Sequence, residues 1–134
     1  MRDDPAKPDD APLVLLVEDE VGLSKLMVMI LEDEGYRVVE AANGAQGLRK
    51  LEQEKPALII TDYMMPELNG LEMVRAIRRD AAYAEVPILL MSAALPRGLA
   101  IQDLVDEFLP KGTELKRLVE TIHRLIDAAC KADD

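Results

Sequence analysis

Short apolar runs alternate along the chain with longer segments in which apolar residues recur at helical spacing. The apolar runs occupy residues 13–17, 36–40, 57–61, 86–91 and 107–110. Helical spacing is found in residues 21–34, 45–54, 71–79 and 113 to about 129. Strands that alternate in this way with helices predict an α/β fold, with a parallel sheet, right-handed crossovers and helices on both faces.

The weakest element lies between the fourth and fifth predicted strands, in residues 93–105. Pro96 and Gly98 interrupt this segment before a short helical pattern begins at Leu99. We therefore expect a short or irregular fourth helix. Two other boundaries carry their own markers, because Gly35 is suited to end the first helix and Thr113 to cap the last one.

Composition indicates one domain, since 134 residues with 49% hydrophobic content suffice for a single core. We expect the domain to span residues 13–130. Residues 1–12 contain three prolines and six charged residues, so we predict a flexible N-terminal segment there, and a disordered tail over residues 131–134.

Charge and apolar content exclude several classes of ligand. A net charge of −10 disfavours direct binding to nucleic acid, which needs clustered Lys and Arg, and it equally disfavours anionic membrane surfaces. The sequence contains neither an apolar stretch long enough to span a membrane nor a secretion signal, so we expect a cytoplasmic protein. The one cysteine, Cys130, cannot form an internal disulfide.

Polar residues end four of the five apolar runs. In a parallel sheet, chemistry collects beyond the carboxyl ends of the strands. If the first and third strands are neighbours, their carboxylates repel one another unless a cation lies between them, and hard oxygen ligands suit Mg²⁺. The carboxylate of the third strand could then attack phosphorus while the ammonium and the hydroxyl hold the transferred oxygens. The residues concerned are Glu18, Asp19 and Glu20 after the first run, Asp62 after the third, Ser92 after the fourth and Lys111 after the fifth.

In this order and spacing the chain resembles a response-regulator receiver domain of two-component signalling, similar to the stand-alone chemotaxis regulator. The resemblance extends over nearly the whole chain from Leu13. It rests on the pair Glu18-Asp19, on Asp62 with Met65-Pro66 and Gly70 in a DxxMPxxxG pattern, on Ser92-Ala93 and on Lys111.

The resemblance implies a flavodoxin-like (βα)5 sandwich with strand order 2-1-3-4-5. It further implies that Asp62 accepts a phosphoryl group from a sensor histidine kinase or a histidine phosphotransfer protein, assisted by Lys111 and Ser92. Asp19, Asp62 and the backbone carbonyl of Met64 would ligate Mg²⁺, and Glu18 would act mainly through metal-bound water. The protein would then be a signalling phosphoacceptor rather than an enzyme.

The family's switch is also implied by the resemblance. Ser92 would move towards the phosphoryl group, the aromatic ring of Phe108 would turn inward, and the changed face would bind a downstream protein. Phe108 has no hydroxyl, so it can respond to packing but cannot gain a hydrogen bond when exposed. We expect a monomer or a weak homodimer.

Two departures from the family pattern matter. Gly112 follows Lys111 where the family usually has a proline, so we predict a trans bond here and a softer hold on Lys111. Met64 and Ala94 occupy positions from which neither side chain can orient an attacking water. We therefore expect slow loss of the phosphoryl group.

Other readings stay open at this point. A receiver-like interaction module that acts without phosphorylation is the main alternative, and the altered residue after Lys111 favours it. A phosphatase of the haloacid-dehalogenase type needs an acid at position 64, and a flavodoxin needs a phosphate-binding loop instead of Glu18-Asp19-Glu20. The sequence is compatible both with a stand-alone protein and with a receiver excised from a hybrid kinase.

Overall fold

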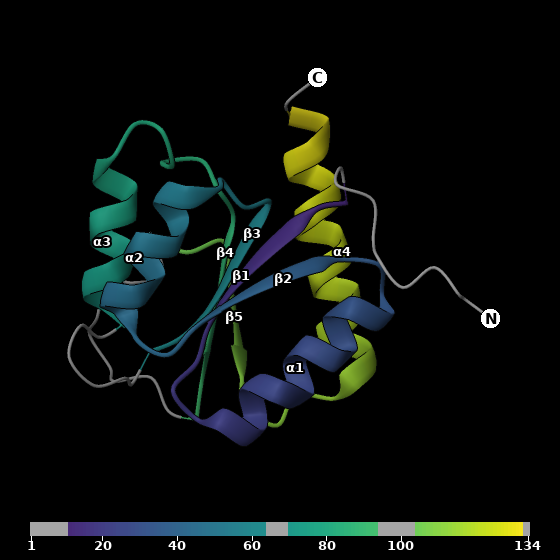
Figure 1. Ribbon diagram of the computed structural model, residues 1–134. Coiled ribbons are helices and arrows are strands. Elements are labelled where there is room, and N and C mark those ends of the chain that lie inside the picture. The colour runs from purple at the N-terminus through teal and green to yellow at the C-terminus, as the bar shows by residue number, and fades with distance from the viewer. Residues whose placement is uncertain (1–10, 64–69, 94–103, 133–134) are drawn as a thin grey trace.

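A five-stranded parallel sheet forms the centre of the molecule, with strand order β2-β1-β3-β4-β5 (Figure 1). The computed structural model describes residues 11–63, 70–93 and 104–132. The strand order confirms the flavodoxin-like prediction. The elements are β1 (Leu13–Val17), α1 (Val21–Asp33), β2 (Arg37–Ala41), α2 (Gly44–Gln53), β3 (Leu58–Asp62), α3 (Gly70–Arg79), β4 (Ile88–Ser92), β5 (Glu107–Pro110) and α4 (Leu115–Ala132).

Helices cover both faces of the sheet, α1 and α4 on one and α2 and α3 on the other (Figure 1). Alternate residues of β1 divide between two apolar cores. Val14 and Leu16 pack in the core that includes Met27 of α1 and Leu118 of α4, whereas Leu15 and Val17 belong to the core that includes α2 and α3. Because both faces are covered, β1 is buried along its whole length, which explains its unbroken apolar sequence.

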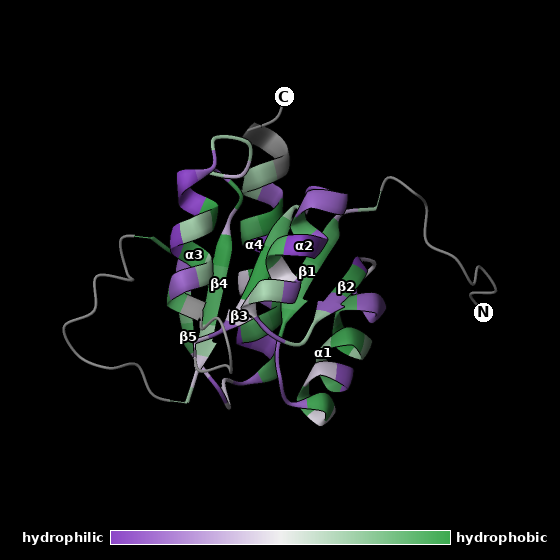
Figure 2. Cartoon of the chain, turned by 60° about the vertical axis from the view of Figure 1, so that its left-hand side comes forward, coloured by the Kyte–Doolittle hydropathy of each residue, from purple (hydrophilic) through white to green (hydrophobic). Residues whose placement is uncertain are grey.

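Figure 2, coloured by hydropathy, shows mainly apolar strands in the centre and helices that carry both apolar and polar residues.

Helix α1 ends as the sequence predicts. Gly35 adopts a positive φ of 95°, its N–H donates to the carbonyl of Glu32, and the N–H of Tyr36 donates to that of Leu31. These two bonds form a Schellman motif, which favours glycine at this position.

Several boundaries differ from those predicted. Strands β3 and β4 include Asp62 and Ser92 as their last residues, because ladder pairing depends on the backbone and tolerates a polar side chain. The last helix continues to Ala132, so residues 131 and 132 of the predicted tail are helical. The predicted short helix between β4 and β5 lies mostly in residues 94–103, outside the described residues. Among the described residues, α4 is the helix that follows β5.

Candidate functional site

The ends of β1 and β3 bring the acidic residues of the sequence together. Val17 pairs with Thr61 in the sheet, so Glu18 and Asp62 follow the same point of two adjacent strands. Glu18 extends the ladder, since its N–H donates to the carbonyl of Ala41 at 3.0 Å. The strand register therefore brings these carboxylates together, as predicted.

Glu18, Asp19 and Asp62 form a compact cluster of three carboxylates. One oxygen atom from each lies within 4.8 Å of the others. Glu18 and Asp62 are buried, whereas Asp19 is exposed. The carboxylate of Glu18 accepts a hydrogen bond from the N–H of Glu20 at 3.0 Å, which fixes it inside the loop after β1. Glu20 itself is exposed and is not part of the cluster.

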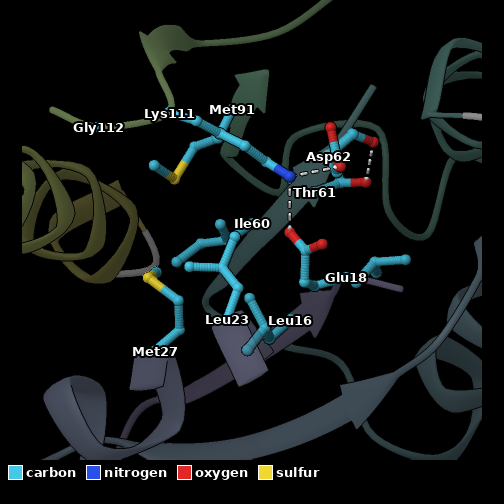
Figure 3. A pocket seen from close by; sticks show the side chains of 11 residues that line it. Leu16, Glu18, Leu23, Met27, Ile60, Thr61, Asp62, Met91, Lys111 and Gly112 are labelled. Carbon is cyan, nitrogen blue, oxygen red and sulfur yellow. Dashed lines mark hydrogen bonds and ion pairs between the residues drawn. The ribbon is translucent and has the colours of Figure 1, made fainter. Parts of the chain in front are cut away.

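Lys111 reaches the cluster from the end of β5 (Figure 3). Its Nζ donates to Oδ2 of Asp62 at 2.7 Å and lies 3.4 Å from Oε1 of Glu18. Its backbone is fixed as well, because its N–H donates to the carbonyl of Ser92 at 3.0 Å. The peptide bonds of the described residues are trans, as predicted for the bond between Lys111 and Gly112.

The electrostatics of the cluster are set by burial and by the excess of carboxylates. Burial raises the pKa of Glu18, and the charge of Asp62 adds to this; the hydrogen bond from Glu20 and the charge of Lys111 oppose it without cancelling it. For Lys111, burial acts to lower the pKa, but the contacts with Asp62 and Glu18 outweigh it and raise the pKa above its usual range. A divalent cation would relieve the remaining negative charge.

A small cavity of about 50 Å³ lies beside the cluster (Figure 3). Its polar lining includes Glu18, Asp62 and Lys111, and its apolar lining includes Leu23 and Met27 of α1 and Met91 of β4. The stem of Lys111 runs along this cavity towards the carboxylates. The cavity could not be predicted from the sequence, because apolar spacing predicts Leu23 and Met27 as core residues without showing how completely the core is filled.

The other predicted site residues occupy the same edge of the sheet. Ser92, which pairs with Pro110 of β5, is 1% exposed. Phe108 is half-buried on β5 and packs against the small apolar cluster of Tyr63 and Leu90. The predicted metal-ligating carbonyl of Met64 lies outside the described residues, as do Ala94, Met65 and Pro66.

The family model described as "Response regulator receiver domain" matches residues 14–123. The chain belongs to the response regulator receiver domain family. It is thus a receiver domain of the two-component signalling type, as the motifs suggested.

The relatives of this receiver domain include transcription regulators and chemotaxis proteins. The chain is 36% identical over 122 residues to the transcriptional regulatory protein GlrR of Escherichia coli K12, and the match covers 90% of this chain and 28% of GlrR. The chain thus spans less than a third of that relative. Its fold resembles that of chemotaxis protein CheY4 of Vibrio cholerae, with a TM-score of 0.79, 28% identity, and coverage of 86% of this chain and 98% of CheY4.

A second solved structure is the receiver domain of sensor histidine kinase PA1611 from Pseudomonas aeruginosa PAO1, which holds a magnesium ion in its active-site cleft. It has a TM-score of 0.80 and 28% identity, and the match covers 87% of this chain and 98% of that one. Among the described residues of the receiver domain, the helices are too short or too polar to span a membrane.

Proposed function

We propose that this receiver domain accepts a phosphoryl group on Asp62 from a histidine kinase or a histidine phosphotransfer protein. The proposal rests chiefly on the buried carboxylate of Asp62, which lies 2.7 Å from Nζ of Lys111 within the acidic cluster. In the transfer, an oxygen of Asp62 bonds to phosphorus as the P–N bond of the donor breaks. The departing imidazole nitrogen keeps the electron pair.

The donor set suits Mg²⁺, which prefers carboxylate oxygens and retains several waters. Asp19 and Asp62 would hold the ion together with the carbonyl of Met64, and Glu18 would contact it mainly through water. When bound, the ion neutralises the negative charge of the cluster and of the incoming phosphoryl oxygens. The magnesium site of the PA1611 receiver, which has the same fold, supports this assignment.

Lys111 and Ser92 would hold the transferred group. The ammonium of Lys111 lies 2.7 Å from the carboxylate of Asp62. Because it is so close, it can pass from the carboxylate to a phosphoryl oxygen bound there over a short distance. The hydroxyl of Ser92, at the end of the neighbouring strand, is suited to donate to a second oxygen. Movement of Ser92 would change the packing space of half-buried Phe108, and a downstream protein would read this change.

The protein therefore functions, in this proposal, as a cytoplasmic signalling phosphoacceptor and not as an enzyme with a separate substrate. It acts through protein contacts rather than through nucleic acid or a membrane surface, in keeping with its net charge of −10. It would be a monomer or a weak homodimer. We expect slow dephosphorylation, because the side chains of Met64 and Ala94 cannot orient a water.

Intact mass spectrometry after incubation with Mg²⁺ and acetyl phosphate tests the proposal. The wild type should gain one phosphoryl group that chelation prevents. Asp62→Asn should gain none, whereas Asp127→Asn, which alters an exposed carboxylate on α4, should behave as the wild type does. If a folded wild type binds Mg²⁺ but gains no phosphoryl group, the result contradicts the proposal and favours an interaction module that acts without phosphorylation.

Calorimetric titration tests the metal assignment separately. Asp19→Asn removes one carboxylate of the cluster at an exposed position, so it should weaken Mg²⁺ binding without unfolding the protein. Glu20→Gln alters the adjacent exposed carboxylate, which lies outside the cluster, and is the matched control. Equal loss of affinity in both variants would mean that general negative charge, and not this donor set, attracts the cation.

A further inference from the structure

The connection between β5 and α4 is a tight turn made of Pro110, Lys111, Gly112 and Thr113. The N–H of Thr113 donates to the carbonyl of Pro110 at 3.1 Å, and the hydroxyl of Thr113 donates to the same carbonyl. Gly112 has a positive φ of 90°. A bond between the first and fourth residues together with a positive φ at the third is typical of a type II β-turn, which favours glycine at that place.

This turn holds the backbone of Lys111 from one side while the sheet holds it from the other. The N–H of Lys111 donates to the carbonyl of Ser92, which ties it to β4. The two bonds of Thr113 to Pro110 close the chain around Lys111. The Lys111 side chain leaves this fixed point and reaches Asp62 and Glu18 (Figure 3).

Thr113 does not cap the last helix, contrary to the role its sequence position suggests. A helix cap accepts hydrogen bonds from backbone N–H groups, but among the described residues the Thr113 hydroxyl donates to the carbonyl of Pro110 and accepts from no N–H of α4. Helix α4 begins later, at Leu115, and the carbonyl of Glu114 accepts from the N–H of Leu118. The hydroxyl thus serves the turn that carries Lys111.

Gly112 is needed here for its backbone conformation and not for lack of space. A Cβ atom added at this position would meet no atom within 4 Å. Residues with side chains rarely adopt a φ of this sign, and a proline, with φ fixed near −65°, could not adopt it at all. The proline that the family usually carries at this position is therefore incompatible with the turn formed here.

We propose that Gly112 and Thr113 are positioning residues for Lys111: they form a hydrogen-bonded turn that places its ammonium against Asp62, in place of the proline typical of the family. This inference rests on the proposed phosphoryl transfer to Asp62. The turn affects the rate of phosphoryl transfer, and it does so only through the position of Lys111.

Four single variants test the turn. Gly112→Ala strains the positive φ without steric conflict, and Thr113→Val removes the hydroxyl while keeping the shape of the side chain. Gly112→Asn and Thr113→Ser are the matched rescue variants, because asparagine tolerates this conformation and serine restores the hydroxyl. The initial rate of adduct formation is measured with acetyl phosphate at saturating Mg²⁺, with Mg²⁺ affinity and urea unfolding measured alongside.

We expect Gly112→Ala to slow transfer about tenfold, since misplacing a catalytic group by about 1 Å can cost a hundredfold. Thr113→Val should be slower than the wild type, and both rescue variants should stay within about twofold of it. In a Lys111→Met background, Gly112→Ala should cause no further loss. An equal loss in that background, or equal rates for Gly112→Ala and Gly112→Asn, would overturn the proposal.

Chemical acetylation of lysines provides a second readout that does not depend on phosphorylation. Lys111 should be protected in the wild type and in Gly112→Asn but labelled faster in Gly112→Ala, whereas exposed Lys116 should react equally in all three. Unchanged labelling of Lys111 in Gly112→Ala would refute positioning by the turn. If the wild type gains no phosphoryl group, the proposed function fails, but the labelling result still decides this inference.

Discussion

Neutralising Glu18 should stabilise the protein when no divalent cation is bound. The change Glu18→Gln keeps the size of the side chain and an oxygen that can accept the hydrogen bond from the N–H of Glu20. It removes one negative charge from a buried position. The raised pKa of Glu18 indicates that the folded protein disfavours its charged form, so the neutral side chain should be favoured.

The distances allow the magnitude to be worked out. At an effective dielectric constant of about 20, the attraction between Glu18 and Lys111 across 3.4 Å amounts to about 5 kcal/mol. The carboxylates of Asp19 and Asp62 lie within 4.8 Å, and each repels Glu18 by about 3.5 kcal/mol. Solvent around exposed Asp19 weakens its repulsion, so attraction and repulsion nearly cancel, and the burial that raises the pKa of Glu18 decides the sign. Because burial disfavours the charged carboxylate, we expect Glu18→Gln to gain about 1–2 kcal/mol.

Urea unfolding in the presence of a chelator measures this gain, and its pH dependence has a defined sign. A carboxyl with a raised folded-state pKa stabilises the fold fully below its ordinary value of 4.5, and this contribution is lost as pH rises through the folded-state pKa. The advantage of Glu18→Gln should therefore be largest at neutral pH and should shrink below pH 4.5. If the cluster binds Mg²⁺ as proposed, excess Mg²⁺ should restore the stability of the wild type.

Glu20→Gln is the matched control, because Glu20 is exposed and its side chain makes no capping bond to α1. Its stability should stay within about 0.5 kcal/mol of the wild type. If Glu18→Gln is no more stable than the wild type at neutral pH without a cation, the claim that the folded protein disfavours the charged form of Glu18 is refuted.

Two further predictions concern the scaffold, and both are measured by urea unfolding. The guanidinium of Arg78 donates to the carbonyls of Leu104, Ala84 and Val86. Arg78→Ala should therefore lower the free energy of unfolding by about 3 kcal/mol. Arg79 is exposed, so Arg79→Ala should lower it by less than about 0.5 kcal/mol. A Cβ atom at Gly47 would lie 2.9 Å from Sδ of Met73 and 3.1 Å from Cγ2 of Val17; we expect Gly47→Ala to destabilise by about 1 kcal/mol, because crowding outweighs the gain in helix propensity. A stabilised Gly47→Ala would mean that Met73 moves aside freely.

The sequence predicted the meeting of Asp62 and Lys111, although 49 positions separate them. It could do so because apolar runs predict strands, alternation with helices predicts a parallel sheet, and parallel strands bring their carboxyl ends to one edge. For the strands, the predicted ends were wrong by one or two residues. These errors arose because apolar pattern reports burial, whereas a strand is defined by its backbone pairing, which Asp62 shares with Met91.

The sequence could not predict what depends on the direction of individual hydrogen bonds. Thr113 fits both a helix cap and a turn, and only the position of its hydroxyl relative to Pro110 distinguishes them. From the sequence, Arg78 is one of several cations on the polar side of a helix, yet its guanidinium joins α3 to the segments before β4 and before β5. Periodicity describes which face a residue occupies but not which carbonyl it reaches.

The charge balance of the site links its stability to its proposed function. Among the described residues, the three carboxylates of the cluster outnumber the ammonium of Lys111, and a divalent cation would reduce this excess of negative charge. The cost of keeping charged Glu18 buried without a cation would therefore be relieved when a metal ion binds. An incoming phosphoryl group adds negative charge again, and Lys111 can compensate only by leaving Asp62 for the new oxygens. In the proposed transfer only the side chain of Lys111 has to move, because its backbone is held by the bond to Ser92 and by the turn at Gly112 and Thr113.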